Sequence, residues 1–423
     1  MPRLLISACL PAVAVLMVSC GRPAPVPPPP VRTAIPVQVG PAGMLRGGQP
    51  YFVKGAGGGG SMEELAARGA NSIRTWDTQG LAQTLDKAER LGLTVSAGLW
   101  LESECGWFSY ANPAHCDKQA ERVRKQVVEH RNHPALLAWG IGNEAEGDGS
   151  NSAFWRQLDR LARMVKDLDP AHPAFTAVAG ASKAKVEGLL RDVPHLDYLG
   201  INTYQGVFTL RRHLKEVGWN RPWMLTEWGP RGFWEAPRSA SDAPVEQTSS
   251  EKAEMIRRAY GETIFPGDGC LGSYVFVWGW KFEATATWFG VFTHEGETTA
   301  TADVLQEMWG KGKPVNQAPS IDKLRDVPAS PVAAGAAFSA QTEARDPDGD
   351  PLVWHWAVLP ERRKSEVGKG QVMPKVVPDT VITDGGPRVD VKAPAVPGIY
   401  RLHVWVKDGK GHAATANRPF EVR

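Results

Sequence analysis

The 423-residue sequence predicts an α/β protein: a (β/α)8 barrel over residues 45–312, followed by a small β-sandwich over residues 313–423. Short apolar runs alternate with helical segments eight times across the first region, whose length is close to the roughly 250 residues typical of such barrels. From Asn316 onward, short β-rich runs and Pro or Gly turns replace the helical periodicity. A doubly wound open sheet is the alternative for the first region, but such sheets seldom reach eight regular units.

Each predicted barrel unit is a strand followed by a helix. The strands are expected at 51–56, 70–76, 94–100, 136–144, 174–180, 198–204, 224–229 and 272–280. The helices are expected at 62–69, 81–91, 118–132, 152–167, 183–192, 210–217, 251–264 and 301–309. Ser61 is a suitable N-cap for the first helix, and Gly69 and Gly92 are suitable stops for the first two. The glycine run 57–60 lacks the lysine and hydroxyl ending of a phosphate-binding loop, so we expect a permissive loop there.

The C-terminal region contains two runs, 351–359 and 398–407, that alternate as half-exposed strands do. Its opening NQAPSI and the acidic turn DPDGD at 346–350 resemble the immunoglobulin-like domains of bacterial surface proteins. Three carboxylates at this spacing suit calcium, but such turns are also common without metal. We interpret the segment as a turn and expect no metal site in the chain.

Composition excludes several classes of function. The net charge is +2, with 22% charged and 42% hydrophobic residues, as is ordinary for a soluble globular protein. No basic stripe indicates a nucleic-acid partner, and no clustered His and Cys spacing indicates zinc. We expect a monomer without a cofactor. The unusual count is 16 tryptophans, which can fill a core or stack on sugar rings.

The N-terminus has the pattern of an export signal over residues 1–20, with an apolar run too short and broken to span a membrane. Its end, LMVSC, resembles a bacterial lipoprotein signal with Met17 where leucine is usual, which implies lipidation of Cys20. An ordinary cleaved signal is the alternative. Residues 21–44 form a tether with a Pro-rich start. We expect an exported protein of the cell envelope, whose one membrane contact is the lipid; Gly21 after the cysteine implies the outer membrane where the cell has one.

The remaining cysteines divide into two groups. Cys105 and Cys116 are close in sequence and in an oxidising compartment, so we expect a disulfide between them. Cys270 opens an apolar run and is expected to be a buried thiol, whereas Cys9 leaves with the signal.

Two of the apolar runs end in a glutamate. One run, 135–141, stops at Gly-Asn-Glu, with Asn143 and Glu144; the other, PWMLTEWG, contains Glu227, 83 residues further on. The carboxyl ends of barrel strands are where such folds keep their chemistry. A single Asn-Glu pair would be explained as a solvated strand end, but a second acid in an equivalent place favours catalysis. A retaining glycosidase needs one acid/base and one nucleophile, about 5–5.5 Å apart.

The segments HRNHPALLAWGIGNE and LTEWG together resemble the catalytic barrel of glycoside hydrolase family 2, and more widely the retaining clan that contains families 5 and 72. The resemblance covers residues 45–312. It implies that Glu144 is the acid/base and Glu227 the nucleophile. It also implies that Arg74 keeps the nucleophile ionised and that Asn143 contacts the sugar 2-hydroxyl.

Further positions at strand ends complete the expected site. The resemblance implies that Tyr204 hydrogen-bonds the nucleophile. Trp278 and Trp280 would alternate onto one face of the eighth strand. The clan commonly has a sugar platform there, so the resemblance implies that at least one of them lines the subsite next to the cleaved bond. Trp100, Trp228 and Trp234 are further candidates at strand ends or in loops. Weaker candidates for substrate binding, chosen by their position at strand tips, are Trp76, Asp77, Asn202 and Glu283.

The sequence departs from family 2 in two ways. Members usually carry a sugar-binding sandwich and an immunoglobulin-like domain before the barrel, whereas here the barrel follows the tether. The histidine-containing motif of the second strand is absent, since Thr75, Trp76 and Asp77 follow Arg74. We therefore expect a retaining β-glycoside hydrolase of oligo- or polysaccharides with an open sugar identity. A β-glucan transglycosylase using the same two glutamates and a non-catalytic glycan-binding envelope lipoprotein are the alternatives.

Overall fold

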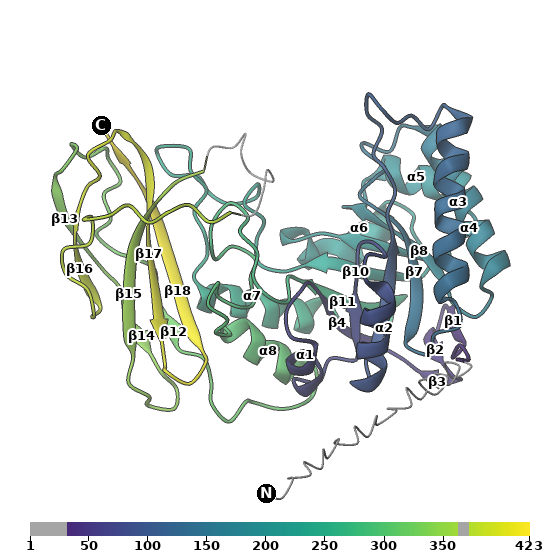
Figure 1. The fold of residues 1–423 in the computed structure, drawn as a ribbon, viewed down its shortest axis with the longest axis horizontal. Helices are drawn as coiled ribbons and strands as arrows, with labels where there is room; N and C mark the ends of the chain where they lie inside the picture. The colour runs from purple at the N-terminus through teal and green to yellow at the C-terminus, as the bar shows by residue number, and fades with distance from the viewer. Residues whose placement is uncertain (1–31, 363–371) are drawn as a thin grey trace, which may run out of the picture. The chain divides into compact units, whose positions relative to one another are not determined.

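A computed structural model describes residues 32–362 and 372–423 (Figure 1). The export signal, the lipidation site Cys20 and the first part of the tether lie outside the described residues. In Figure 1 the barrel runs from purple to green, and the strands of the C-terminal sandwich are light green to yellow.

Within the described residues, eight parallel strands close into a barrel in chain order, and the last strand pairs with the first. The strands are β4 (Val53–Gly57), β5 (Ser72–Arg74), β6 (Thr94–Leu99), β7 (Leu136–Asn143), β8 (Ala174–Ala179), β9 (Tyr198–Asn202), β10 (Trp223–Trp228) and β11 (Cys270–Phe276). The helices that follow them are α1 (Met62–Ala67), α2 (Leu81–Arg90), α3 (Pro113–His130), α4 (Ser152–Leu168), α5 (Lys183–Asp192), α6 (Leu210–Glu216), preceded by η1 (Gln205–Thr209), α7 (Ser249–Glu262) and α8 (Ala300–Met308). The predicted (β/α)8 barrel is confirmed.

Among the boundaries that differ from the prediction, those of α3 and β11 bear on the site. Helix α3 begins at Pro113 and not at residue 118, because Asn112 caps it through a hydrogen bond from Ala114 N and proline suits the first helical position. Strand β11 ends at Phe276, so residues 277–280 belong to a loop. The second difference changes the expected sugar platform.

The interior of the barrel is filled by tightly packed side chains. Phe175 and Tyr198 stack there with ring centroids 4.8 Å apart. A Cβ on Gly140 of β7 would come within 2.8 Å of the Phe175 ring, so glycine is needed where that ring crosses the strand. This packed interior places the open end of the barrel, and its polar residues, at the carboxyl ends of the strands.

A small antiparallel sheet packs on the amino end of the barrel. It consists of β1 (Val37–Gly40), β2 (Gly43–Arg46) and β3 (Gln49–Pro50). Val37 N donates to Ala171 O at 2.8 Å, and Arg46 Nη2 donates to Pro134 O at 2.7 Å, both in turns that precede barrel strands. Residues 37–44, which the sequence analysis assigned to the tether, therefore belong to the folded domain.

The C-terminal region is an antiparallel β-sandwich, as predicted. Its strands are β12 (Ser320–Ile321), β13 (Ala337–Gln341), β14 (Ala344–Arg345), β15 (Val353–Pro360), β16 (Arg388–Lys392), β17 (Gly398–Lys407) and β18 (Ala413–Val422). The two runs with alternating pattern form β15 and β17, which pair with each other. Trp356, Leu402 and Phe420 are among the buried residues of its core.

The acidic segment at 346–350 forms a turn that its own side chains hold. Asp346 Oδ1 accepts hydrogen bonds from the backbone N–H groups of Asp348 and Asp350, at 2.9 and 3.0 Å. Lys410 Nζ lies 2.6 Å from Asp350 Oδ1 and offsets part of the negative charge. One carboxylate oxygen each of Asp346, Asp350 and Asp408 lies within 4.8 Å of the others.

The predicted disulfide between Cys105 and Cys116 is wrong, because both are free thiols. Cys116 is buried on α3 with its Sγ 3.4 Å from Tyr110 O, whereas Cys105 is exposed in a turn where it bridges Phe108. Cys270 is a buried thiol, as expected. In the part of the chain that the structure describes, no helix combines the length and apolarity that crossing a bilayer requires.

Candidate active site

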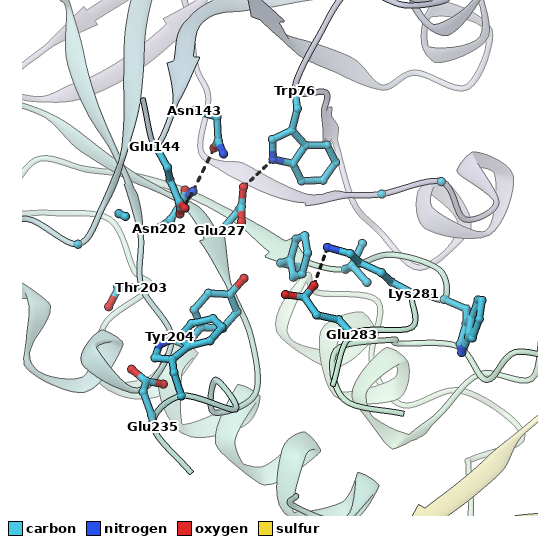
Figure 2. A pocket seen from close by; sticks show the side chains of 18 residues that line it. Trp76, Asn143, Glu144, Asn202, Thr203, Tyr204, Glu227, Glu235, Lys281 and Glu283 are labelled. Carbon is cyan, nitrogen blue, oxygen red and sulfur yellow. Dashed lines mark hydrogen bonds and ion pairs between the residues drawn. The ribbon is translucent and has the colours of Figure 1, made fainter. Parts of the chain in front are cut away.

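A cavity of about 1010 Å³ opens at the carboxyl ends of the barrel strands. Strands β7, β9 and β10 contribute Asn143, Asn202 and Glu227 to its lining, and Glu144 follows β7 directly. Both glutamate side chains point into the cavity (Figure 2). The fourth and seventh barrel strands thus bring together two acids that are 83 residues apart in the chain.

Glu227 is held by two donors from the end of β5. Its Oε1 accepts hydrogen bonds from Arg74 Nη1 at 3.0 Å and from Trp76 Nε1 at 2.5 Å. Arg74 is 3% exposed and Glu227 8%, so water screens this ion pair little. A guanidinium bound to a carboxylate in this way forms a charge-assisted hydrogen bond. Arg74 therefore occupies the position that the sequence analysis expected.

Glu144 is in a different environment. Its backbone φ is +51°, in the left-handed region, directly after Gly142 with φ +80°. Loss of hydration within the cavity raises the pKa of its carboxyl group, and the Glu227 charge raises it further, while a hydrogen bond from Asn202 acts in the opposite direction. Although the residue remains open to the solvent of the cavity, its carboxyl group holds a proton to a higher pH than an ordinary glutamate.

Two amides connect the acids. Asn202 Nδ2 donates to Glu144 Oε1 at 2.8 Å and to Asn143 Oδ1 at 3.1 Å. Arg74 Nη2 donates to the same Asn143 oxygen at 2.6 Å. Because Asn143 Oδ1 is occupied, its Nδ2 is the group it can offer to a substrate hydroxyl. Thr226 Oγ1 donates to Asn202 Oδ1 at 2.7 Å and fixes the orientation of that amide.

Tyr204 lines the cavity but does not make the predicted contact. Among the hydrogen bonds of the described residues, none joins its hydroxyl to Glu227. Its ring packs edge-on against Trp234 and Phe276, at centroid distances of 5.2 and 6.2 Å. Burial raises the pKa of Tyr204 well above its usual value, and the Glu227 charge adds to this, so the phenol stays protonated.

A sequence model described as glycosyl hydrolases family 2, TIM barrel domain, matches residues 64–310, which is more than half of the chain. The chain belongs to glycosyl hydrolase family 2. The matched region contains Glu144 and Glu227, together with Arg74 and both connecting amides.

Two curated relatives are named β-glucuronidase. A β-glucuronidase of Paenibacillus borealis is 26% identical over 280 residues, which are 57% of this chain and 43% of that protein. A β-glucuronidase of Sus scrofa is 26% identical over 152 residues, which are 35% of this chain and 22% of that protein. The chain spans less than half the length of these two relatives.

Solved structures of the same kind share the fold. The β-D-glucuronidase of Dictyoglomus thermophilum superposes with a TM-score of 0.52 at 22% identity, over 66% of this chain and 54% of that one. The β-glucuronidase of Ruminococcus gnavus gives a TM-score of 0.52 at 18% identity, over 66% and 53% of the two chains.

Trp228 was predicted to bind substrate, but it does not line the cavity. It is fully buried and packs against Tyr260 of α7 with ring centroids 5.4 Å apart. Adjacent residues of a strand point to opposite faces. Since Glu227 points into the barrel mouth, Trp228 points outward to the helical layer, and the prediction is wrong.

Trp278 is also buried in the core, so its assignment to the substrate-binding residues is wrong. Its ring packs against Phe292 and Trp309, and its Nε1 donates to Ser61 O at 2.8 Å. Because β11 ends at Phe276, the alternation that would have placed Trp278 and Trp280 on one face does not continue. Trp280 lines the cavity, as predicted.

The long loops after β10 and β11 supply residues that periodicity does not identify. Glu235 and Lys281 line the cavity and were not predicted. Glu235 Oε2 accepts from two backbone N–H groups, those of Gln205 and Gly232, at 3.1 and 2.9 Å. Of the other candidates, Trp76, Trp234 and Glu283 line the cavity, whereas Asp77 and Trp100 border a separate hollow.

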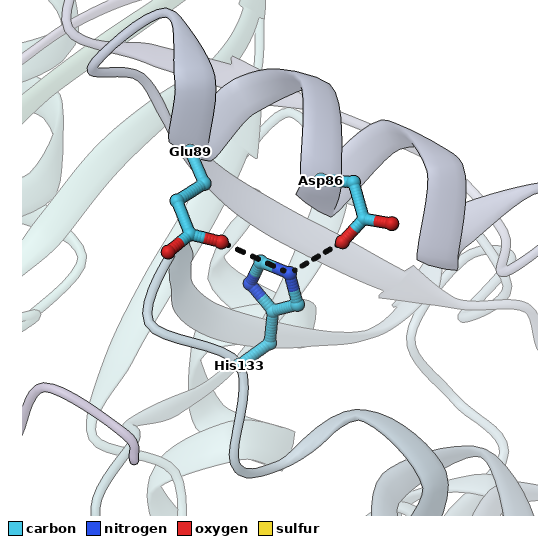
Figure 3. Close-up of side chains that lie close together, drawn as sticks. All are labelled: Asp86, Glu89 and His133. Atoms are coloured by element: carbon cyan, nitrogen blue, oxygen red, sulfur yellow. Dashed lines mark hydrogen bonds and ion pairs between the residues drawn. The ribbon is translucent and has the colours of Figure 1, made fainter. Parts of the chain in front are cut away.

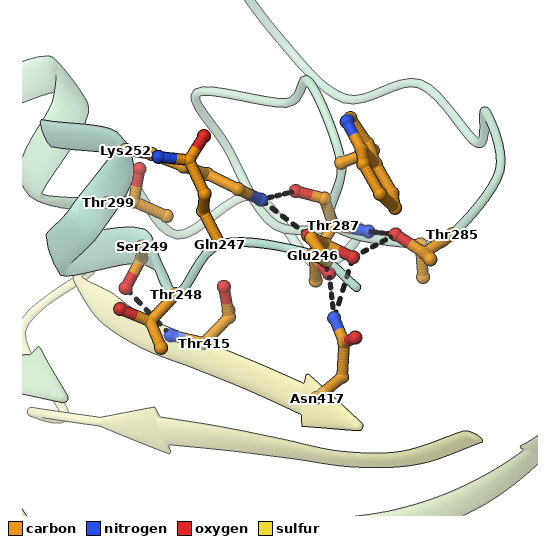
Figure 4. A network of polar contacts seen from close by, with 12 residues as sticks. Glu246, Gln247, Thr248, Ser249, Lys252, Thr285, Thr287, Thr299, Thr415 and Asn417 are labelled. Carbon is orange, nitrogen blue, oxygen red and sulfur yellow. Dashed lines mark hydrogen bonds and ion pairs between the residues drawn. The ribbon is translucent and has the colours of Figure 1, made fainter. Parts of the chain in front are cut away.

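A buried polar network fastens these loops to the C-terminal sandwich (Figure 4). Glu246, from the loop after β10, accepts from Lys252 Nζ at 2.5 Å, from Thr285 and Thr287 hydroxyls at 2.5 and 2.8 Å, and from Asn417 Nδ2 of β18 at 2.6 Å. Burial acts to raise the pKa of Glu246, but the Lys252 ammonium and these donors outweigh it and lower it to about 2. The loop after β11, which carries Trp280, Lys281 and Glu283, is therefore tied to the sandwich.

A second cluster has a structural explanation. His133, in the turn before β7, faces Asp86 and Glu89 of α2 (Figure 3). Its Nδ1 accepts the backbone N–H of Ala135 at 3.1 Å, so Nε2 carries the proton and donates to Asp86 Oδ1 at 3.1 Å. A protonated Nε2 cannot ligate a metal. The cluster holds the turn that leads into β7.

Proposed function

We propose that this family 2 protein is a retaining β-glycoside hydrolase of oligo- or polysaccharides, with Glu227 as nucleophile and Glu144 as acid/base. The supporting observation is that two carboxyl groups of one cavity have opposite environments. The Glu227 carboxylate is paired with a guanidinium, whereas the raised pKa of Glu144 lets it keep a proton. A double displacement needs this division of roles.

In the first step Glu144 donates its proton to the glycosidic oxygen while a Glu227 oxygen attacks the anomeric carbon. The bond from that carbon to the leaving oxygen breaks, and a glycosyl ester of Glu227 forms. In the second step Glu144, now a carboxylate, takes a proton from water as the water attacks the anomeric carbon and releases Glu227. Arg74 and Trp76 stabilise the departing carboxylate.

The charges of the cavity favour an uncharged sugar. Four carboxyl groups line it, those of Glu144, Glu227, Glu235 and Glu283. Lys281 carries the one cationic side chain among the described lining residues, and its Nζ is 2.5 Å from Glu283 Oε2. A uronate would have to compete for that ammonium and would add negative charge. We therefore propose a neutral β-linked sugar, although the relatives are named β-glucuronidases.

A panel of p-nitrophenyl β-D-glycosides tests both statements. We expect turnover of a glucoside, galactoside, mannoside or xyloside to exceed that of the glucuronide, with release of the β-anomer first in proton NMR. Glu227→Gln should abolish turnover and keep the fold, and a 2-deoxy-2-fluoro glycoside of the preferred sugar should label Glu227 in a peptide mass spectrum. Initial release of the α-anomer would exclude the retaining mechanism. A wild type inert on the whole panel and on β-linked oligosaccharides would exclude the activity.

We also propose that a lipid on Cys20 holds the protein at the cell envelope. The support is the sequence pattern at residues 16–20, because the structure describes the chain from residue 32. Cys20→Ala should move the protein from the membrane fraction to the soluble fraction, and Cys9→Ala is the matched control that should leave it in place. Membrane association of the Cys20→Ala variant would contradict the proposal.

A further inference from the structure

The exposed tryptophans of the described residues all lie in loops that leave the carboxyl ends of barrel strands. They are Trp100, Trp107 and Trp234, which are 43%, 71% and 55% exposed. The first two belong to the loop between β6 and α3, and the third to the loop after β10. Trp234 lines the catalytic cavity, but Trp100 and Trp107 do not. Leaving two indoles of one loop in water is unfavourable, so a binding role accounts for them better than packing does.

Trp107 and Trp100 border two adjoining hollows. The first, about 310 Å³, is lined by Trp107 and by residues of α3 that include Lys118, Gln119 and Arg122. The second, about 520 Å³, is lined by Trp100, by Arg122 and Gln126, and by the loop after β5. We name the two hollows together, with Arg122 between them, the α3 groove.

Arg122 gives the α3 groove a fixed centre. Its Nη2 donates to Trp100 O at 3.0 Å and to Glu102 Oε2 at 2.9 Å. Glu102 Oε2 also accepts from Gln119 Nε2 at 2.7 Å. The side chains of Arg122, Glu102 and Gln119 are therefore already oriented, so binding a ligand would cost little conformational entropy at these residues.

The loop after β5 borders both the catalytic cavity and the α3 groove. Trp76 lines that cavity and donates to Glu227, and the next three residues, 77–79, line the hollow beside Trp100. Because β6 pairs with β5, the loop that carries Trp100 and Trp107 is the next one around the barrel mouth. A glycan chain that left the cavity past Trp76 would therefore run toward Trp100 and Trp107.

The lining fits a pyranose ring. Such a ring has apolar C–H faces, which a flat exposed indole can cover, and a rim of hydroxyls, which carboxylate, amide and ammonium groups can bind. Trp107 supplies the flat surface, and Glu102, Gln119 and Lys118 supply polar groups around it. Phe108 forms a firm floor, because it stacks on His115 with centroids 5.4 Å apart.

We propose that the α3 groove is a distal subsite for a neutral β-linked glycan chain, and that it selects long substrates over short ones. The inference rests on the proposed function and adds the kind of substrate: a polysaccharide whose chain extends from the cleaved bond to Trp107. Short glycosides end inside the catalytic cavity and do not reach the groove.

Affinity gel electrophoresis tests the groove without turnover. The full chain carrying Glu227→Gln is run through gels containing laminarin, hydroxyethyl cellulose, xylan or glucomannan. We expect retardation by at least one polysaccharide, and about a tenfold weaker apparent affinity when Trp107→Ala is added. Trp107→Phe should retain most of the affinity, and Val128→Ala, which truncates an exposed apolar side chain of α3, should change nothing.

Kinetics separate this inference from the proposed function. With Glu227 intact, Trp107→Ala should raise KM for the retarding polysaccharide and leave kcat/KM for the preferred p-nitrophenyl glycoside unchanged. If the wild type hydrolyses no substrate, the proposed function is wrong. The gel experiment then still shows whether the α3 groove binds a polysaccharide. Equal retardation of the Trp107→Ala variant and its parent, or no retardation by any of the four polysaccharides, would overturn the subsite even in an active enzyme.

Discussion

Arg74 and Asn143 form a 2.6 Å hydrogen bond that joins the two carboxyl groups of the cavity into one network. The Arg74 guanidinium also binds Glu227, and the amide oxygen of Asn143 also accepts from Asn202, which binds Glu144. The nucleophile and acid/base proposed here are therefore positioned by the same chain of donors.

This bridge predicts a large effect of Arg74→Lys on activity. Lysine keeps the charge but cannot donate to Glu227 and Asn143 at once, so kcat/KM should fall about 10²-fold or more. Steady-state kinetics on the preferred glycoside give the measurement. Arg68→Lys is the matched control, since Arg68 is also buried but pairs with Glu64 and Asp303 outside the cavity. Equal activities of the two variants would contradict the assigned role of Arg74.

The raised pKa of Glu144 predicts the alkaline limb of the pH profile. The first step needs protonated Glu144, so kcat/KM should fall as the pH rises through its pKa. The hydrogen bond from Asn202 lowers that pKa, so Asn202→Ala should raise it and move the limb to higher pH. A limb that stays in place or moves to lower pH would assign the ionisation to another group.

The network around Glu246 predicts that the sandwich contributes to the stability of the barrel loops. Glu246→Ala leaves the buried Lys252 ammonium without its counter-charge, and should lower the free energy of unfolding by about 3–5 kcal/mol. Asn417→Ala removes one donor and should cost about 1–3 kcal/mol. Urea denaturation measures both free energies of unfolding. If neither variant loses more stability than an exposed control such as Glu295→Ala, the network does not contribute as proposed.

The same residue predicts an acid-sensitive component of stability. Glu246 has a folded-state pKa of about 2 against an ordinary 4.5, so its contribution is complete above pH 4.5 and is lost as the pH falls toward 2. Glu246→Gln should flatten the loss of stability over that window. Thermal unfolding at a series of pH values, compared between wild type and variant, checks this expectation.

Because the thiols are free, we expect the stability of the protein to be the same with and without a reductant. Dithiothreitol should not change the melting temperature, because Cys105 and Cys116 form no disulfide. Exposed Cys105 should react quickly with Ellman's reagent in the folded protein. Cys116 and Cys270 should react after denaturation, since burial raises the pKa of both thiols, that of Cys270 to about 11. An intact mass two units below that of the reduced chain would show a disulfide and contradict this prediction.

The barrel could be predicted from the sequence because its elements are local. An apolar run buried on both faces indicates a parallel strand wherever it occurs, and amphipathic segments between such runs indicate the helices. Glu144 and Glu227 were recognisable because each ends such a run. The residues that surround them were harder to predict, since Trp76, Glu235 and Lys281 lie in loops, where no periodicity states which way a side chain points.

By itself, the sequence determined the fold class, the order of the elements and the two strand ends that carry acids, because hydrophobic periodicity depends on near neighbours in the chain. Only the tertiary structure decided that Trp228 and Trp278 face the core, that Trp76 donates to Glu227, and that Asn417 reaches Glu246. These contacts join residues far apart in sequence, and the closing of the barrel and the packing of the sandwich bring them together.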